Sequence, residues 1–231
     1  MKINSGKNLA GWEVVVGDAV QHVEPEPPVA TSDLTTVHKS DHSELQVNVK
    51  RREIMAHNIT YTQDKDDDNL TAIHACRFQF RLPDRPAANA SANWLGETIE
   101  GGFFVWDGKN TRLDYGLAFQ WVVNPWDKRA SNINSWAHTK WVRQTRLEFD
   151  TEWHEVWMVL DIQKQTASMV IDGMPVPTVF SKTPKAADWE KNTVARLQAE
   201  IVSLNPGPSH IKIAHRAQFR NWSWIKNTDR A

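Results

Sequence analysis

The sequence predicts an all-β protein whose strands form antiparallel sheets in a sandwich or a barrel. Most of its second half consists of short runs rich in β-branched and aromatic residues, separated by turn pairs such as Asp107-Gly108, Asp172-Gly173 and Pro206-Gly207. Long amphipathic helical stretches are missing, and the best helical candidate is the short segment 185–191. Many strands at short spacing without intervening helices are typical of antiparallel sandwiches and barrels. At 231 residues the chain fits one domain, residues 1–231.

The predicted strands follow one another along the whole chain. The first third is more polar and offers two long candidates, 44–62 and 71–83. Between them, Asp66-Asp67-Asp68 is interpreted as a solvated turn, because it lacks the Gly and the distal Glu of a calcium loop. The prolines of segment 23–33 predict a surface loop or an edge. The remaining candidate strands are 101–107, 115–124, 153–162, 166–173, 194–204 and 210–225.

Charge and hydropathy bear on partners and location. The chain has 27 basic and 28 acidic residues, so its formal net charge is -1 and no strong field attracts nucleic acid or an anionic membrane. We therefore expect neither partner. The N-terminal stretch has no apolar signal-peptide core, and no segment approaches about 18 uninterrupted apolar residues. We expect a cytoplasmic protein, or a secreted one if a signal peptide has been removed.

Motifs for common cofactors are missing from the sequence. The one cysteine, Cys76, excludes intramolecular disulfides and a cysteine-based zinc site, and its apolar surroundings predict a buried core residue. Gly-rich nucleotide loops, HExxH and the nucleophile elbow are not found. We expect no nucleotide cofactor and nominate no metal ligands. The twelve tryptophans suit either a thick core or a ligand groove, because a Trp face stacks on sugar rings as well as on other side chains.

Period-two alternation assigns residues to faces of three predicted strands. Segment 71–83 has an apolar face backed by one that carries Arg77 and Arg81. The corresponding polar faces of 115–124 and 194–204 carry Gln120 on the first, and Gln198 and Glu200 on the second. We hypothesise that these polar faces adjoin and line one concave groove. The alternative is that each is the solvated side of an ordinary antiparallel sheet.

Residues 151–177 resemble the hairpin common to concanavalin A-like lectins, laminin-G-like domains and glucanases. The matching residues are Trp153, His154, Val156, Asp161, Val170, Ile171, Asp172 and Gly173. The order of the opening, middle and closing strands is also similar to that family. The resemblance implies an antiparallel, two-sheet jelly-roll β-sandwich of the concanavalin A-like type, and it keeps calcium open as an ion. It implies no single activity, because this fold carries lectins, hydrolases, lyases and inert modules.

The string Glu148-Phe149-Asp150-Thr151-Glu152 matches the E-x-D-x-E motif of family 16 glucanases. In those enzymes, alternating carboxylates on one strand supply the nucleophile and the acid/base. Here the string runs directly into the Trp153-His154 hairpin, whereas the glucanase strand lies well upstream. We interpret it as an acidic turn that opens a strand.

Face assignment and fold analogy nominate candidate site residues. Glu200 and Glu100 are the carboxylates suited to general acid/base work, and Tyr115 with His138 is the pair suited to β-elimination of a uronate. Segment 124–141 is interpreted as a long, Trp-bearing loop. The candidate ligand-binding residues are Arg77, Arg81, Gln120, Gln198, Arg112, Trp126, Trp136 and Trp141. Arginine binds carboxylates bidentately, and Gln and Glu satisfy sugar hydroxyls.

Three hypotheses of function follow. The first is a carbohydrate-recognising or carbohydrate-active protein, as a glycoside hydrolase or polysaccharide lyase if it is an enzyme, with its ligand in the concave groove. The second is an intracellular cyclase, isomerase or lyase that acts on a non-sugar small molecule in a Trp-lined pocket. The third is a non-catalytic interaction module. A glycan array with lyase and glucanase assays separates the first from the other two. The oligomeric state is not predicted.

Overall fold

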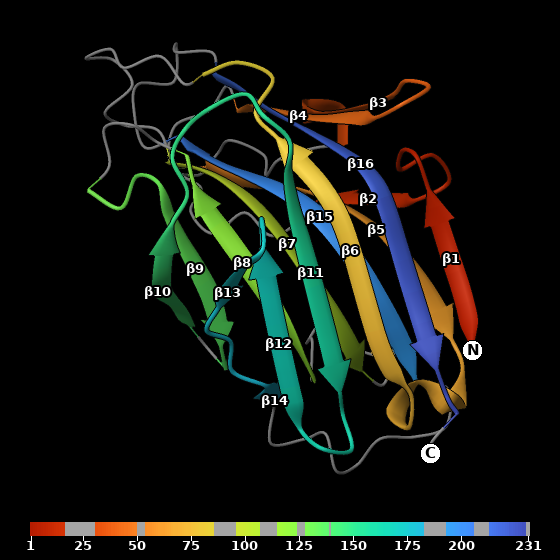
Figure 1. Ribbon diagram of the computed structural model, residues 1–231. Helices are drawn as coiled ribbons and strands as arrows, with labels where there is room; N and C mark the ends of the chain where they lie inside the picture. The colour runs from red at the N-terminus through yellow and green to blue at the C-terminus, as the bar shows by residue number, and fades with distance from the viewer. Residues whose placement is uncertain are drawn as a thin grey trace.

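The described strands form two antiparallel sheets stacked face to face (Figure 1). The computed structural model describes residues 1–16, 31–49, 54–85, 96–106, 115–123, 128–138, 140–182, 193–205 and 213–229. Sheet A has the order β13 (Met174–Val176), β12 (Thr166–Ile171), β11 (His154–Asp161), β6 (Ile73–Arg81), β16 (Ile213–Asn227), β4 (Ser43–Val49) and β3 (Leu34–His38), with β1 (Lys2–Gly6) also paired to β16.

Sheet B contains the strands that carry most of the candidate site. Its order is β10 (Lys140–Arg146), β9 (Asn132–Ala137), β8 (Tyr115–Val122), β7 (Gly96–Trp106), β15 (Val194–Asn205), β5 (Ile54–Lys65) and β2 (Glu13–Val16), with β14 (Ser181–Lys182) paired to β8. Each sheet has eight strands among the described residues, and every strand pair is antiparallel. Two short 3-10 helices, Thr31–Asp33 and Asp67–Leu70, complete the described elements.

The core lies between the sheets and is rich in aromatic rings. Phe80 of β6 lies with its ring centroid 5.0 Å from that of Phe119 and 6.0 Å from that of Trp121, both on β8 of the other sheet. Cys76 is buried on the same face of β6, and burial raises the pKa of its thiol. These contacts confirm the predicted apolar faces of 71–83 and 115–124, and the prediction that Cys76 is a core residue.

Two parts of the predicted strand pattern differ from the structure. Segment 44–62 is not one strand: β4 lies in sheet A and β5 in sheet B. Segment 124–141 is not one long loop, because β9 and β10 pair as a hairpin from Asn132 onward. Polar residues on both strands hid their alternation. The helical candidate 185–191 and most of segment 23–33 lie outside the described residues.

The hairpin that carries the resemblance is held by its own polar residues. β11 pairs with β12 in antiparallel register, and Asp172 and Gly173, with φ of 50° and 77°, form the turn from β12 to β13. His154 is buried and bonds Asp172 Oδ2 at 2.7 Å through Nδ1, and Asp150 Oδ1 at 3.0 Å through Nε2. Asp172 Oδ1 also accepts from the Glu155 amide at 2.8 Å. These residues therefore stabilise the fold.

Replacing His154 with Phe tests this structural role. The substitution keeps a flat ring in the core but leaves both carboxylates without their imidazole partner. Because hydrogen bonds to charged groups contribute about 1.5–3 kcal/mol each, and these carboxylates are one-third exposed, we expect a loss of about 2 kcal/mol in the free energy of unfolding. Urea denaturation of the two proteins measures it. A difference below about 0.5 kcal/mol would contradict the role.

The acidic runs also have structural partners. Glu148 and Glu152 are exposed and lie between β10 and β11, while Asp150 bonds His154 and the Glu152 amide, which confirms the turn interpretation of that string. Asp66 caps the second 3-10 helix and lies 2.9 Å from Lys226 Nζ. Among the residues that the structure describes, no cluster of three His, Cys, Asp or Glu is arranged to hold a metal ion.

Candidate functional site on the outer face of sheet B

A row of polar side chains crosses the outer face of sheet B. Glu200 of β15 lies directly opposite Glu100 of β7, Glu100 opposite Gln120 of β8, and Gln120 opposite Asn134 of β9. The residues beside them along the strands, such as Ile99 and Ile201, point into the core, so alternation places these four on the outer face. We call Glu200, Glu100, Gln120 and Asn134 the polar row.

Hydrogen bonds connect one side of the row into a chain. Asn134 Nδ2 donates to Gln120 Oε1 at 2.8 Å, and Gln120 Nε2 donates to Glu100 Oε1 at 2.7 Å. Thr98 Oγ1 donates to the same Glu100 oxygen at 2.7 Å. Among the described residues, Glu100 Oε2 takes no hydrogen bond, so this oxygen is the one left to hold and transfer a proton.

Glu200 has a separate set of donors. His57 Nδ1 of β5 is hydrogen bonded to Glu200 Oε1, and Gln198 Nε2 donates to Glu200 Oε2 at 3.1 Å. The two glutamates therefore face each other across neighbouring strands while bound to different partners.

Both glutamates of the pair are buried, and burial raises the pKa of Glu100. Glu100 and Glu200 are only 8% and 4% exposed, although they lie on an outer face. Burial, followed by the nearby Glu200 charge, raises the pKa of Glu100 from 4.5 to about 7. Two carboxyls on directly opposed strand positions do not both ionise readily in a low-dielectric site. Glu100 is therefore the member of the pair that holds the proton near neutral pH.

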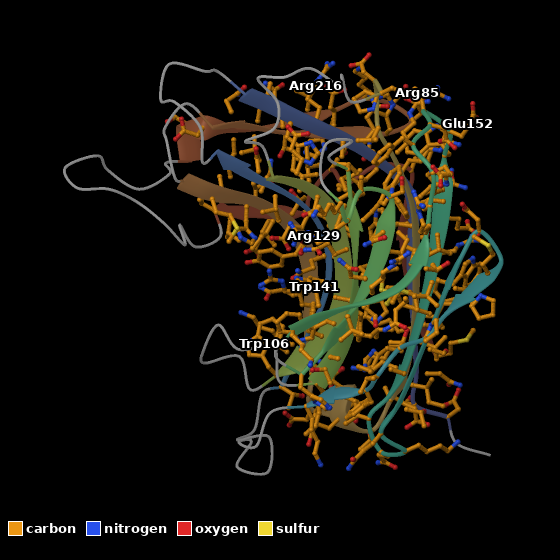
Figure 2. All side chains as sticks on the ribbon, turned by 90° about the vertical axis from the view of Figure 1, so that its left-hand side faces the viewer. Arg85, Trp106, Arg129, Trp141, Glu152 and Arg216 are labelled. Atoms are coloured by element: carbon orange, nitrogen blue, oxygen red, sulfur yellow. The ribbon has the colours of Figure 1, made fainter. Side chains whose placement is uncertain are left out.

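An aromatic cluster lies next to the polar row. Phe104, Trp106, Ala118 and Val194 pack together on the outer face, with Trp136 and Trp141 against them. The last two are cross-strand partners on β9 and β10 with ring centroids 5.2 Å apart. Figure 2 shows Trp106 and Trp141 on the side of the sandwich away from Glu152, which precedes β11 of sheet A. Such rings offer faces on which a flat, apolar ligand surface stacks.

Two glycines make room for this cluster. A Cβ at Gly102 would come within 2.5 Å of the Phe104 ring, and one at Gly116 within 2.3 Å of it. Phe104 therefore lies over the backbone of its neighbours, where any side chain at those positions would displace it. This packing brings the aromatic cluster close to the floor of the sheet beside Glu100.

Arg196, which stacks on aromatic rings, and Gln198 border the polar row on its other side. The guanidinium carbon of Arg196 lies 4.1 Å from the centroid of the Tyr61 ring and 5.8 Å from that of the Trp106 ring. Gln198 is 6% exposed, and its Oε1 has no hydrogen-bond partner among the described residues. A buried acceptor without a partner is costly, so it marks a place where a ligand hydroxyl would be stabilised.

The single groove expected from the sequence is wrong in one respect. Gln120, Gln198, Glu100 and Glu200 do share one face, but Arg77 and Arg81 lie on β6 of sheet A and point outward on the opposite side of the sandwich. Each strand's faces were predicted correctly. The sheet to which each strand belongs depends on long-range pairing that alternation does not reveal.

The other nominated residues are dispersed. Tyr115 packs against the core, with its ring centroid 5.3 Å from that of Phe180, while His138 is exposed in the β9–β10 turn with φ of 60°. The structure therefore does not join them as an acid/base pair on one face. Arg112 and Trp126 lie outside the described residues. Trp136 and Trp141 belong to the aromatic cluster.

Sequence reasoning missed two residues of this site, and it placed a third, Arg196, on the polar face of 194–204 without nominating it. His57, Tyr61 and Arg196 contact the polar row or border it. The alternation of segment 54–65 puts His57 and Tyr61 on one face, so that signal was present. It was obscured because 44–62 was treated as one continuous strand.

The raised pKa of Glu100 predicts a pH-dependent stability. The folded chain holds this proton up to about pH 7 and the unfolded chain releases it near 4.5, so the favourable contribution is complete below 4.5 and is lost as the pH rises to about 7. Glu100→Gln removes that loss. We expect the variant to be more stable than the wild type by on the order of 3 kcal/mol at pH 8, and nearly equal to it at pH 4. Urea denaturation at both values measures this, with the exposed Glu148→Gln as a matched control. A difference independent of pH would contradict the assignment.

Comparisons with known proteins concern the fold. No protein-family model matches the chain, and no curated protein matches it. Among solved structures, a Lotus tetragonolobus seed lectin matches with a TM-score of 0.51 at 11% identity, covering 100% of both chains. A sialidase matches with a TM-score of 0.51 at 9% identity, covering 84% of this chain and 16% of the sialidase. A Bacillus subtilis protein described as galectin-like in fold matches with a TM-score of 0.49 at 10% identity, covering 94% of this chain and 89% of that one.

The comparisons and the sheet topology agree. The seed lectin is matched over its whole length, whereas the chain spans only a small part of the sialidase. None of the helices in the described ranges is long and apolar enough to cross a membrane. Two antiparallel sheets with a shared core and this structural likeness give one conclusion: the chain has the concanavalin A-like jelly-roll sandwich fold.

Proposed function

We propose that this protein is a glycoside hydrolase that binds a carbohydrate on the outer face of sheet B. The observation that carries the proposal is the pairing of Glu100 with Glu200 across neighbouring strands. Directly opposed strand residues have Cβ atoms about 4.5–5.5 Å apart, and from such positions two Glu side chains can bring their carboxyl groups to the separation of about 5–5.5 Å that retaining glycosidases use. The pair therefore suits hydrolysis with retention of configuration.

In the proposed reaction Glu100 is the general acid and base, and Glu200 is the nucleophile. Glu100, protonated near neutral pH, donates its proton to the glycosidic oxygen as the bond from that oxygen to the anomeric carbon breaks. The Glu200 carboxylate attacks the anomeric carbon and forms a glycosyl ester. Water then attacks the same carbon, Glu100 takes the proton of that water, and Glu200 leaves as a carboxylate. His57 and Gln198 are positioning residues that orient Glu200 through their hydrogen bonds.

The surroundings of the pair suit a sugar. The amides of the polar row suit hydroxyl groups, as does Gln198 Oε1, which has no partner among the described residues, and the aromatic cluster suits the apolar face of a pyranose ring. Two structural neighbours, the seed lectin and the sialidase, are carbohydrate proteins by name, which supports the substrate class.

A screen of substrates tests the proposal. The wild type is incubated with aryl glycosides of the common pyranoses and with soluble polysaccharides, and released phenol and reducing sugar are measured. We expect hydrolysis of at least one substrate with net retention at the anomeric carbon, followed by proton NMR. No turnover of any substrate, or a product with inverted configuration, would contradict the proposed hydrolase.

A glycan-binding protein without turnover is the second candidate, and the fold favours it because the fully covered neighbour is a lectin. A glycan array separates it from the hydrolase. Binding without turnover would support it, and Trp136→Ala should then weaken binding, because that ring belongs to the aromatic cluster. Silence on the array, with tight binding of an aromatic metabolite, would instead support an enzyme of non-sugar chemistry.

A further inference from the structure

A depression lies on the side of the molecule opposite the polar row, on the outer face of sheet A. Its volume is about 390 Å³, and it is open to solvent between β1, β6, β11 and β16. Residues from all four strands or from the chain that follows them line it, among them Ser5, Lys7, Arg77, Gln79, Glu155 and Asn221. Ligand sites for small molecules begin at about 300 Å³, so the space suits a monosaccharide-sized molecule.

A β-bulge creates the depression. The pairing of β16 with β6 steps from Arg220 opposite Gln79 to Ser223 opposite Arg77, which leaves one extra residue on β16. Asn221 takes a φ of 50° at this step, and its backbone N–H donates to the Lys7 carbonyl at 3.1 Å. The bulge therefore ties the chain that follows β1 to the rim and brings Lys7 beside the depression.

Two contacts orient the Arg77 side chain but leave its terminal nitrogens available to a ligand. Its Nε donates to Ser223 Oγ at 3.1 Å, and its guanidinium carbon lies 4.9 Å from the centroid of the Trp157 ring. The Glu155 carboxylate is 4.0 Å from Nη1, beyond hydrogen-bond distance, and its other oxygen accepts from Trp157 Nε1 at 2.6 Å. The terminal nitrogens of Arg77 therefore make no hydrogen bond among the described residues.

The charges in the depression favour an anion. Arg77 and Lys7 contribute two positive charges, and within the described part of the chain the Lys7 ammonium makes no hydrogen bond or ion pair. Glu155 is the one acidic residue of the described lining: its Oε1 accepts from Trp157 and its Oε2 lies 4.0 Å from Arg77 Nη1, so the described lining keeps a net charge of +1. An oriented guanidinium with unused terminal nitrogens matches the two oxygens of a carboxylate.

We infer that this depression is a binding site for a sugar acid, a monosaccharide that carries a carboxylate. The carboxylate lies against Arg77 and near Lys7. Ser5, the Gln79 side-chain nitrogen and the Asn221 side-chain oxygen offer partners for hydroxyl groups, since Gln79 Oε1 already accepts from Arg220 and Asn221. The site is distinct from the glutamate pair, because β6 and β16 belong to sheet A and β7 and β15 to sheet B. Binding at this depression does not require the proposed hydrolase activity.

Titration followed by amide NMR tests the site with three probes: glucuronate, glucose and glucose 6-phosphate. We expect glucuronate to shift the amide signals of residues around Asn221 and Ser223, and glucose to bind at least 10-fold more weakly, because it has no carboxylate. Glucose 6-phosphate binding more tightly than glucuronate would overturn the assignment to a carboxylate. Equal affinity for glucose and glucuronate would overturn the role of charge.

Variants separate this site from its surroundings. Arg77→Ala should weaken glucuronate binding by about 10–100-fold, in line with the loss of a charge-assisted hydrogen-bonded pair. Arg77→Lys keeps the charge but not the fork, and should give an intermediate loss. Arg216→Ala, an arginine on the same sheet outside the depression, is the matched control and should bind as the wild type does. Equal losses in the Arg77 and Arg216 variants would overturn the site.

Discussion

Replacing Glu200 with Gln should lower kcat by about 10³-fold or more on the substrate that the screen identifies. The amide keeps the size of the side chain and can still meet its neighbours, but it cannot attack the anomeric carbon as a carboxylate does. Stopped assays of released reducing sugar measure the loss. Circular dichroism of the variant checks that the sandwich is intact.

Glu100→Gln tests the other half of the pair. We expect a loss of about 10²–10⁴-fold on substrates with poor leaving groups, because general acid catalysis is removed. The wild type should lose activity as the pH rises through about 7, where Glu100 gives up its proton, and this alkaline limb should disappear in the variant. The controls are Glu148→Gln and Glu152→Gln, exposed members of the E-x-D-x-E string. If those variants lost activity and the Glu100 and Glu200 variants kept it, the assignment would be wrong.

Trp121→Ala should be among the most destabilising substitutions in the chain. Trp121 is 0% exposed, packs between Phe80 and His154, and donates from Nε1 to the Leu147 carbonyl at 3.0 Å. Truncating a buried Trp costs about 3–5 kcal/mol, and the carbonyl left without its donor adds about 1–3 kcal/mol. We therefore expect the variant to be largely unfolded near room temperature, or to melt far below the wild type.

A partly exposed tryptophan provides the comparison for Trp121. Trp157 is 40% exposed on the outer face of sheet A, where it packs against Arg77 and donates from Nε1 to Glu155 Oε1 at 2.6 Å. Trp157→Ala should lower the free energy of unfolding by about 1–2 kcal/mol, the scale of one exposed cation–π contact and one hydrogen bond, and far less than Trp121→Ala. Urea denaturation of both variants gives the test. Similar losses at the two positions would contradict the assignment of the core.

The faces of single strands could be predicted from the sequence, whereas their neighbours could not. Alternation along 194–204 correctly separated Glu200 from Ile201, because the inner side of the strand is apolar from Ala195 to Ile201. It could not show that Arg77 is on the other sheet, since sheet membership is set by pairing between distant segments. The opposition of Glu100 and Glu200 depends on such pairing, as does the contact of His57 with Glu200.

Local polarity explains the remaining differences. Asn132 to Ala137 contains polar residues on both faces, because Asn134 faces outward while Ser135 is buried, so the segment lacked the apolar alternation of a strand. The His154 hairpin was predicted well because its turn chemistry is local: Asp172-Gly173 suits the positive φ values that the turn needs. Features that depend on short-range geometry could be predicted from the sequence, whereas features that depend on strand order could not.

The most direct test of the split roles of the glutamate pair is covalent trapping. The protein is incubated with a 2-deoxy-2-fluoroglycosyl fluoride of the sugar that it hydrolyses, which forms the glycosyl ester but releases it slowly, and the labelled peptide is sequenced by mass spectrometry. We predict one sugar per chain, attached to Glu200 in the peptide that contains β15. A label on Glu148, Asp150 or Glu152, or hydrolysis of the probe with no labelled chain, would contradict the account.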